Sequence, residues 1–267
     1  MENRIQIIDR DGGIKAEACA DGQVVLAWKG EYAEGDRIVF RAGKTNAFYV
    51  LRADDCIDES FVYLTREEIV FDIPFEEKKL CYNPKAFTGE RHYLIMRPAE
   101  EWEISRYRNL AHNPMDQHGD TGYWPHASAN VETRGESVFA ARNAIDGLLA
   151  NDSHGRWPYG SWGINMQDDA ELTLEFGRPV DFDKILLYTR ADFPHDNWWT
   201  QVTLTFSDGT EETVELEKSS RPHAIPLVRE GITWLKLGRL IKADDPSPFP
   251  ALTQIEVYGT ESKKQQI

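Results

Sequence analysis

The segment Arg142–Trp162, RNAIDGLLANDSHGRWPYGSW, carries the features from which the fold and the function are predicted. It begins with helical character and turns at Asp146-Gly147, because glycine reaches backbone angles that other residues avoid. After a polar loop it ends in three large aromatic residues, Trp157, Tyr159 and Trp162. Exposing such side chains is costly, so each one either packs into a core or belongs to a binding surface.

Short apolar runs with Gly, Pro and Asp between them lie on both sides of this segment. Before it come RIQIIDR (4–10), QVVLAW (23–28), RIVF (37–40), AFYVL (47–51), FVYL (61–64), IVFDI (69–73) and HYLIM (92–96). After it come ELTLEF (171–176), KILLY (184–188), QVTLTF (201–206), EETVEL (211–216), ITWLKL (232–237) and LTQIEVY (252–258). Strands this short and this regularly spaced predict an all-β chain made of two β-sandwich domains.

The expected division places an N-terminal β-sandwich of unknown role at residues 1–110 and an ordered linker at 111–125. A second sandwich follows at 126–260, and a frayed tail at 261–267. Within the second sandwich, Ser137–Ile145 is the best candidate for a short helix. The turn Asp208-Gly209 predicts a hairpin between its two flanking strands.

A net charge of −15 bounds the partners of the chain. It argues against nucleic acid and against anionic membrane surfaces, both of which need clustered Lys and Arg. No apolar run is long enough to span a membrane, and MENRIQIIDRDGG has no secretory pattern. Cys19, Cys56 and Cys81 form no C-x-x-C pair, so we expect reduced, buried thiols in a cytoplasmic protein. Nothing in the composition indicates an oligomeric state.

The second half carries an ordered series of short motifs. These are ASAN (127–130), NAIDG (143–147), WG (162–163), LTLEFG (172–177), FSDG (206–209) and QIEVYG (254–259). In this order the series resembles the discoidin, or coagulation factor 5/8 type C, family of galactose-binding-like domains. The resemblance implies an eight-stranded jelly-roll sandwich of the carbohydrate-binding-module type, often with a structural calcium ion under the ligand loops.

By the same resemblance, the calcium ligands would be Asp146, Ser153 with Asn151 or Asp152 nearby, and Glu256. Calcium takes six to eight hard oxygen ligands, which an irregular loop supplies well. Leu148-Leu149-Ala150 lengthens the loop relative to the family pattern. The alternative is an Asp-Gly turn without metal, in which Asp146 bonds its own backbone.

The predicted ligand residues lie in two loops. Arg190–Trp199, RADFPHDNWW, combines aromatic faces with planar polar groups, the mixture that sugar recognition needs. Adjacent Trp198 and Trp199 point to opposite sides of an extended chain, so one is expected in the core. The expected ligand residues are Trp157, Tyr159, Trp162, Arg190, Asp192, His195, Asp196 and Trp198. The alternative is a structural ion pair of Arg190 with Asp192 or Asp196.

The preferred hypothesis is a non-catalytic carbohydrate-binding protein, with no catalytic residue assigned. A second hypothesis is a metal- or acid/base-dependent sugar hydrolase or lyase in an inter-domain cleft. It would use histidines at 112, 118, 126, 154 and 195 with neighbouring aspartates. A third is a protein-interaction module. The proline-rich segment ADDPSPFPAL (243–252) either joins the ligand end of the sandwich or is a rigid connector.

Overall fold

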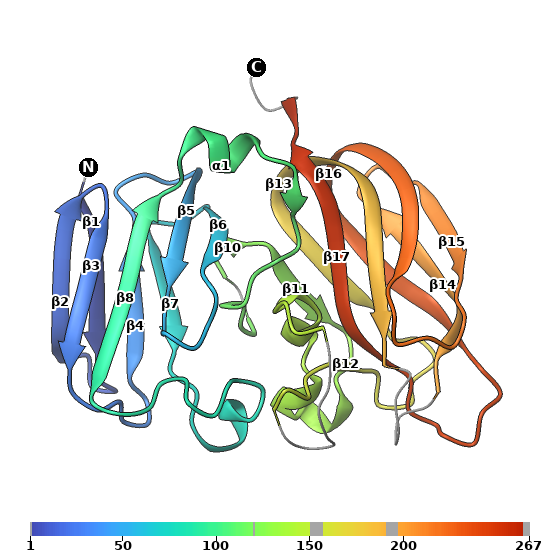
Figure 1. The fold of residues 1–267 in the computed structure, drawn as a ribbon, viewed down its shortest axis with the longest axis horizontal. Coiled ribbons are helices and arrows are strands. Elements are labelled where there is room, and N and C mark those ends of the chain that lie inside the picture. Colours follow the sequence, from blue (N-terminus) through green and yellow to red (C-terminus); the bar gives the residue numbers. More distant parts are fainter. Residues whose placement is uncertain (1, 120, 150–156, 191–196, 264–267) are drawn as a thin grey trace.

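The computed structural model describes residues 2–119, 121–149, 157–190 and 197–263. Nearly all regular structure in these residues is antiparallel β-sheet, arranged in three sheets (Figure 1). The predicted all-β class is therefore confirmed. None of the described helices is long and apolar enough to cross a membrane.

The first half of the chain forms a sandwich of two sheets, in the order β2-β1-β4-β7 and β10-β6-β5-β8-β3. Their strands are β1 (Glu2–Ile8), β2 (Ile14–Asp21), β3 (Val24–Lys29), β4 (Arg37–Arg41), β5 (Ala47–Arg52), β6 (Ser60–Leu64), β7 (Glu68–Asp72), β8 (Arg91–Pro98) and β10 (Tyr123–Trp124). Alternating residues such as Ile5 and Ile7 face inward and are fully buried. Of these strands, β2 and β10 were not predicted: the inward side chains of β2 are mostly small alanines, and β10 has only two residues and lies in the predicted linker.

The segment after β8 returns to this sandwich before the second half begins. The helix α1 (Glu101–Ser105) is followed by β9 (Arg108–Asn109), which pairs with β17, while β10 pairs with β6. Met115 and Tyr123 are buried in the core of the first sandwich. The described residues of the predicted linker thus contact both halves of the molecule, and the domain boundaries stay a prediction.

The second half is built around two long, bent strands. Its elements are β11 (His126–Ala129), β12 (Trp162–Gly163), β13 (Leu172–Thr189), β14 (Trp199–Phe206), β15 (Glu211–Glu215), β16 (His223–Lys242) and β17 (Ala251–Glu261). The N-terminal part of β13 pairs with β11, and its C-terminal part pairs with β17. Register shifts near Gly177 and Gly231 bend β13 and β16, so both enter two layers around one core.

Several local predictions changed. The segments 171–176 and 184–188 are one strand, β13, rather than two. Ser137–Ile145 forms 3₁₀ turns at Ser137–Phe139 and Ala141–Ile145 instead of one helix, and further 3₁₀ turns lie at Glu76–Lys79 and Thr133–Gly135. The β14–β15 hairpin at Asp208-Gly209 is confirmed. Glu261 ends β17 and Ser262 is buried, so the ordered chain continues past the predicted start of the tail. Cys19 is exposed rather than buried.

Candidate functional site

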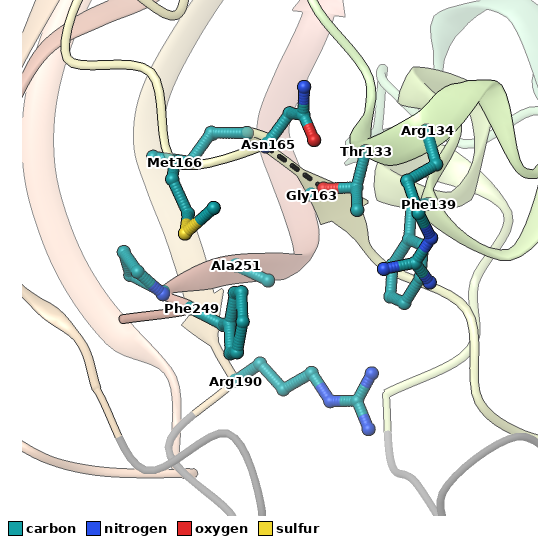
Figure 2. Close-up of a pocket in the computed structure, with 11 residues that line it drawn as sticks. Thr133, Arg134, Phe139, Gly163, Asn165, Met166, Arg190, Phe249 and Ala251 are labelled. Carbon is teal, nitrogen blue, oxygen red and sulfur yellow. Dashed lines mark hydrogen bonds between the residues drawn. The ribbon is translucent and has the colours of Figure 1, made fainter. Parts of the chain in front are cut away.

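A cavity of about 160 Å³ opens at the end of the second sandwich where the predicted ligand loops begin. We call it the Arg190 cavity. Figure 2 shows residues from four separate segments around it: the 3₁₀ turns at 133–139, the turn after β12, the end of β13 and the start of β17. The lining residues are Thr133, Arg134, Phe139, Gly163, Ile164, Asn165, Met166, Arg190, Phe249, Pro250 and Ala251.

Arg190 forms one side of this cavity although it is only 2% exposed. Its backbone N–H donates to the carbonyl of Ala251 at 2.9 Å, which fixes the end of β13 to the start of β17. Its guanidinium carbon lies 4.1 Å from the ring centroid of Tyr159, and Nη1 donates to the carbonyl of Tyr159 at 3.3 Å. The buried Tyr159 therefore packs against the guanidinium and helps to hold it in place.

Apolar side chains form part of the lining. Phe139 is buried, whereas Phe249 is 42% exposed and Met166 is 59% exposed. Figure 2 shows the Arg190 side chain running beneath Phe249, on the side of the cavity opposite to Thr133 and Asn165. A planar cationic donor next to exposed aromatic surface is an arrangement that recognises a polar ring with one apolar face.

The turn that closes the cavity is held in an unusual conformation. Asn165 and Met166 have φ of 50° and 59°, in the left-handed region that side chains other than glycine rarely adopt. The backbone N–H of Asn165 donates to Thr133 Oγ1 at 2.9 Å, which holds this turn. A Cβ added at Gly163 would lie 2.6 Å from the same Thr133 oxygen, so close approach requires glycine there. Strain of this kind concentrates at functional sites.

The predicted ligand residues do not all meet at this cavity. Arg190 lines it, and Tyr159 supports Arg190. Trp157 lines a different cavity. Trp198 is half-buried, with Lys218 Nζ 5.2 Å from its ring, while the adjacent Trp199 is fully buried, as the opposite-sides argument predicts. Three further predicted ligand residues, Asp192, His195 and Asp196, lie outside the described residues.

Trp162 corrects the prediction for the opening segment. It is 0% exposed in the core of the second sandwich, 6.3 Å from the ring of Trp199. Its indole N–H donates to the carbonyl of Val131 at 2.9 Å. No face of this ring is available to a ligand, so Trp162 acts in folding and not in binding.

The residues proposed for calcium are only partly described, since Asn151 and Ser153 lie outside the described residues. Asp146 is buried and accepts a hydrogen bond from the Leu148 N–H at 2.9 Å. The Glu256 carboxylate accepts instead from the Tyr188 and Tyr258 hydroxyls, at 3.4 and 3.3 Å. Over the described ranges no group of three or more His, Cys, Asp or Glu is placed to hold a metal ion. Calcium remains a prediction from the resemblance.

The described histidines of the enzyme hypothesis lie in separate environments. His126 Nδ1 is 2.7 Å from Asp116 Oδ1 in the interior, and His118 Nε2 is 2.7 Å from Glu132 Oε2 at the surface. The Glu132 carboxylate raises the pKa of His118. Burial lowers the pKa of His112, whose ring lies against Gly147. His154 and His195 lie outside the described residues.

Of the eleven lining residues, the sequence singled out only Arg190 as a ligand residue; those it missed include Thr133, Phe139, Asn165, Met166 and Phe249. Phe249 lies in the proline-rich segment that was considered for this end of the sandwich, so its sequence signal was present. The side chains of Asn165 and Met166 carried no such signal, because the turn they form depends on a hydrogen bond to Thr133, far away in the sequence.

No family model and no curated protein matches this sequence. The structure is similar to the lectin binding domain of lectinolysin, as a mutant in complex with Lewis b: 18% identity, 58% of this chain and 99% of that chain, TM-score 0.42. It is also similar to a mutant chitosan-binding module of a chitosanase/glucanase from Paenibacillus sp. IK-5. The identity is 18%, the match covers 58% of this chain and 100% of that chain, and the TM-score is 0.40. A module from Clostridium perfringens in complex with GlcNAc-α-1,4-galactose matches with 17% identity. The match covers 60% of this chain and 97% of that chain, with a TM-score of 0.40.

These modules have the galactose-binding-like fold that the sequence resemblance predicts for the second half. At such identities and TM-scores the likeness carries no argument about a ligand. A function for this chain is therefore inferred from the residues of the Arg190 cavity alone.

Proposed function

We propose that this chain binds a carbohydrate in the Arg190 cavity without chemically changing it. The observation that supports this most directly is the pairing of the buried Arg190 with the exposed ring of Phe249 on one small cavity. The guanidinium would donate to neighbouring hydroxyl groups, and the phenyl ring would pack against the C–H face of the sugar.

The frame of the cavity supports binding with little rearrangement. The Arg190 backbone is tied to Ala251, its guanidinium is supported by Tyr159, and the Asn165 turn is tied to Thr133. Groups held in place before a ligand arrives lose less conformational entropy on binding.

Calorimetric titration against a panel of neutral and uronic-acid sugars tests the proposal. Phe249→Ala should weaken binding about tenfold or more while leaving the fold intact, because this ring is partly exposed. Arg190→Lys should weaken it too, because a lysine cannot form the planar two-pronged contact. Val228→Ala removes an equally apolar, exposed side chain away from the cavity and should bind like the wild type.

Silence across the panel, or wild-type affinity of Phe249→Ala for a sugar that binds, would count against this site. The thermal unfolding midpoint of each variant separates lost binding from lost folding. Weaker binding by Arg190→Lys supports the site if the thermal unfolding midpoint of this variant stays near that of Phe249→Ala.

A further inference from the structure

The charged side chains that line the Arg190 cavity have the same sign. Arg134 and Arg190 are the two charged residues of the lining, and none of its described residues is an aspartate or a glutamate. The chain as a whole has a net charge of −15, so this lining differs from the average surface of the molecule. Two cations without a lining acid favour a ligand that carries negative charge.

A series of contacts joins the two guanidinium groups through two aromatic rings. The guanidinium carbon of Arg134 lies 5.6 Å from the ring centroid of Phe139, and that ring packs edge-on against Tyr159 with centroids 5.9 Å apart. The guanidinium carbon of Arg190 lies 4.1 Å from the ring centroid of Tyr159. Figure 2 shows the side chains of both arginines ending on the side of the cavity where Phe139 lies. The aromatic pair therefore holds the two cations around one small space.

The guanidinium of Arg134 has one edge left for a ligand. Its Nε and Nη2 donate to the two carboxylate oxygens of Glu136 at 2.6 and 2.7 Å. A guanidinium has five N–H donors, and within the described residues Nη1 donates to no acceptor. The side chain is 61% exposed, and Glu136 is not a lining residue. Nη1 and the second N–H of Nη2 form the fork that a carboxylate accepts from with both oxygens.

The backbone at Arg134 is held in an unusual conformation, like the turn beside it. Arg134 has a φ of 53°, close to the values of 50° at Asn165 and 59° at Met166. Seven described residues other than glycine have positive φ, and three of them line this one cavity. Such backbone costs free energy and is concentrated where side chains must be placed for function. This clustering favours a placed Arg134 over a solvated surface arginine.

We propose that the Arg190 cavity takes a uronic acid, whose carboxylate accepts two hydrogen bonds from the open edge of Arg134. This inference rests on the proposed function and names the class of sugar that the site binds. Arg190 and Phe249 act on the hydroxyl groups and the apolar face of the same ring. Arg134 then distinguishes acidic from neutral sugars, because a hydroxymethyl group in place of the carboxylate cannot form the ion pair.

Two pairs of sugars that differ only in a carboxylate against a hydroxymethyl group test the inference: galacturonic acid with galactose, and glucuronic acid with glucose. Calorimetric titration at neutral pH measures the preference for the acid as a ratio of affinities. We expect the acid of at least one pair to bind about fivefold or more tightly than its neutral partner. At about 1 M salt, where charges are screened beyond about 3 Å, this ratio should fall toward one.

Two arginine variants locate the preference. Arg134→Gln keeps a polar side chain and removes the charge, so it should lose most of the preference for the acid. Arg239→Gln is the matched control, because Arg239 has a φ of 48°, is 67% exposed and donates to both carboxylate oxygens of Glu211 at 2.8 and 2.9 Å. Arg239 does not line the cavity, so its variant should keep the wild-type ratio.

Equal affinity for the acidic and neutral partners would overturn the inference, and so would a preference that Arg134→Gln retains. The proposed function would survive both results, whereas silence towards every sugar would contradict it and this inference together. Acetate supplies the carboxylate without the ring, so displacement of the uronic acid by an equal concentration of acetate would also overturn the inference. Arg134→Lys keeps the charge without the fork and should retain part of the preference, which separates the lost contact from a folding defect.

Discussion

Asp146 is a buried carboxyl whose ionisation costs free energy. Its pKa rises from 3.8 to about 7 because burial removes water from the charged form. Between these two values the folded chain keeps the proton while the unfolded chain has lost it. The free energy of unfolding therefore falls as pH rises from about 4 to 7, and the full cost is present above the folded pKa.

Asp146→Asn removes this titration while keeping an oxygen that can accept from the Leu148 N–H. We expect the stability of the variant relative to wild type to increase between pH 5 and pH 8, by more than about 1 kcal/mol and at most ~4 kcal/mol. Urea unfolding at several pH values measures the difference. A constant difference across this range would show that Asp146 does not titrate there.

Asp208→Asn provides the control with the opposite sign. The Asp208 carboxylate accepts from the Thr210 hydroxyl and N–H, which lowers its pKa. A lowered pKa contributes stability above the unfolded value that is lost as pH falls. The variant should thus be less stable than wild type at neutral pH, and the difference in stability should shrink as the pH falls into the acid range.

At the scale of elements, β17 joins the Asp-Gly turn to the sheet through one side chain. Gln254 is fully buried; its Nε2 donates to the carbonyl of Ala144 at 2.7 Å, and its Oε1 accepts from the Gly147 N–H at 3.2 Å. Both partners are backbone groups of the turn that contains Asp146. The amide of Gln254 therefore fixes the position of that turn relative to β17. The resemblance had instead implied that Glu256, in the same strand, joins the turn through a shared calcium ion.

Gln254→Met keeps the volume of the side chain but removes both hydrogen bonds, and it leaves the buried Ala144 carbonyl without this partner. We expect it to destabilise the fold by roughly 1–3 kcal/mol, the cost of one unpaired buried polar group. Chemical unfolding measures this. Gln254→Glu is acceptor-only when ionised but regains one O–H donor when protonated, so its stability should fall between those of wild type and Gln254→Met at acid pH. Equal stability of Gln254→Met and wild type would contradict the role of the amide.

The sequence located most strands, but it did not show which distant residues meet in the folded chain. Alternation located most strands, but it split β13 at Gly177, because the pattern breaks where the strand bends between layers. Arg190 was found from its local composition. Phe139 and Met166 were not singled out, because nothing local places them beside a residue far along the chain. The three aromatic residues of the opening segment lie in three environments: Trp157 lines a cavity, Tyr159 is in the first core and Trp162 is in the second. The cost of exposing an aromatic ring could not distinguish these positions.

At the scale of the whole molecule, Glu261 connects the two halves through two arginines. Its carboxylate accepts from Arg178 Nε at 2.9 Å and Nη2 at 2.8 Å, and also from Arg108 Nη2. The guanidinium carbon of Arg108 lies 4.3 Å from the ring centroid of Phe61, and that of Arg178 lies 5.2 Å from Phe48. These rings belong to the first sandwich, whereas Glu261 ends the last strand of the second.

Glu261→Ala would leave two largely buried guanidinium groups without their shared counter-ion at this junction. We expect a loss of about 3–5 kcal/mol, the usual cost of removing one partner of a buried ion pair. Because the junction joins the halves, the loss should also separate their unfolding into two transitions, which differential scanning calorimetry resolves. Glu136→Ala breaks a similarly two-pronged pair with Arg134 that is exposed, at 2.6 and 2.7 Å, and should cost less than about 1 kcal/mol. If the two variants lost the same stability, the halves would be held together by apolar contact and not by this ion pair.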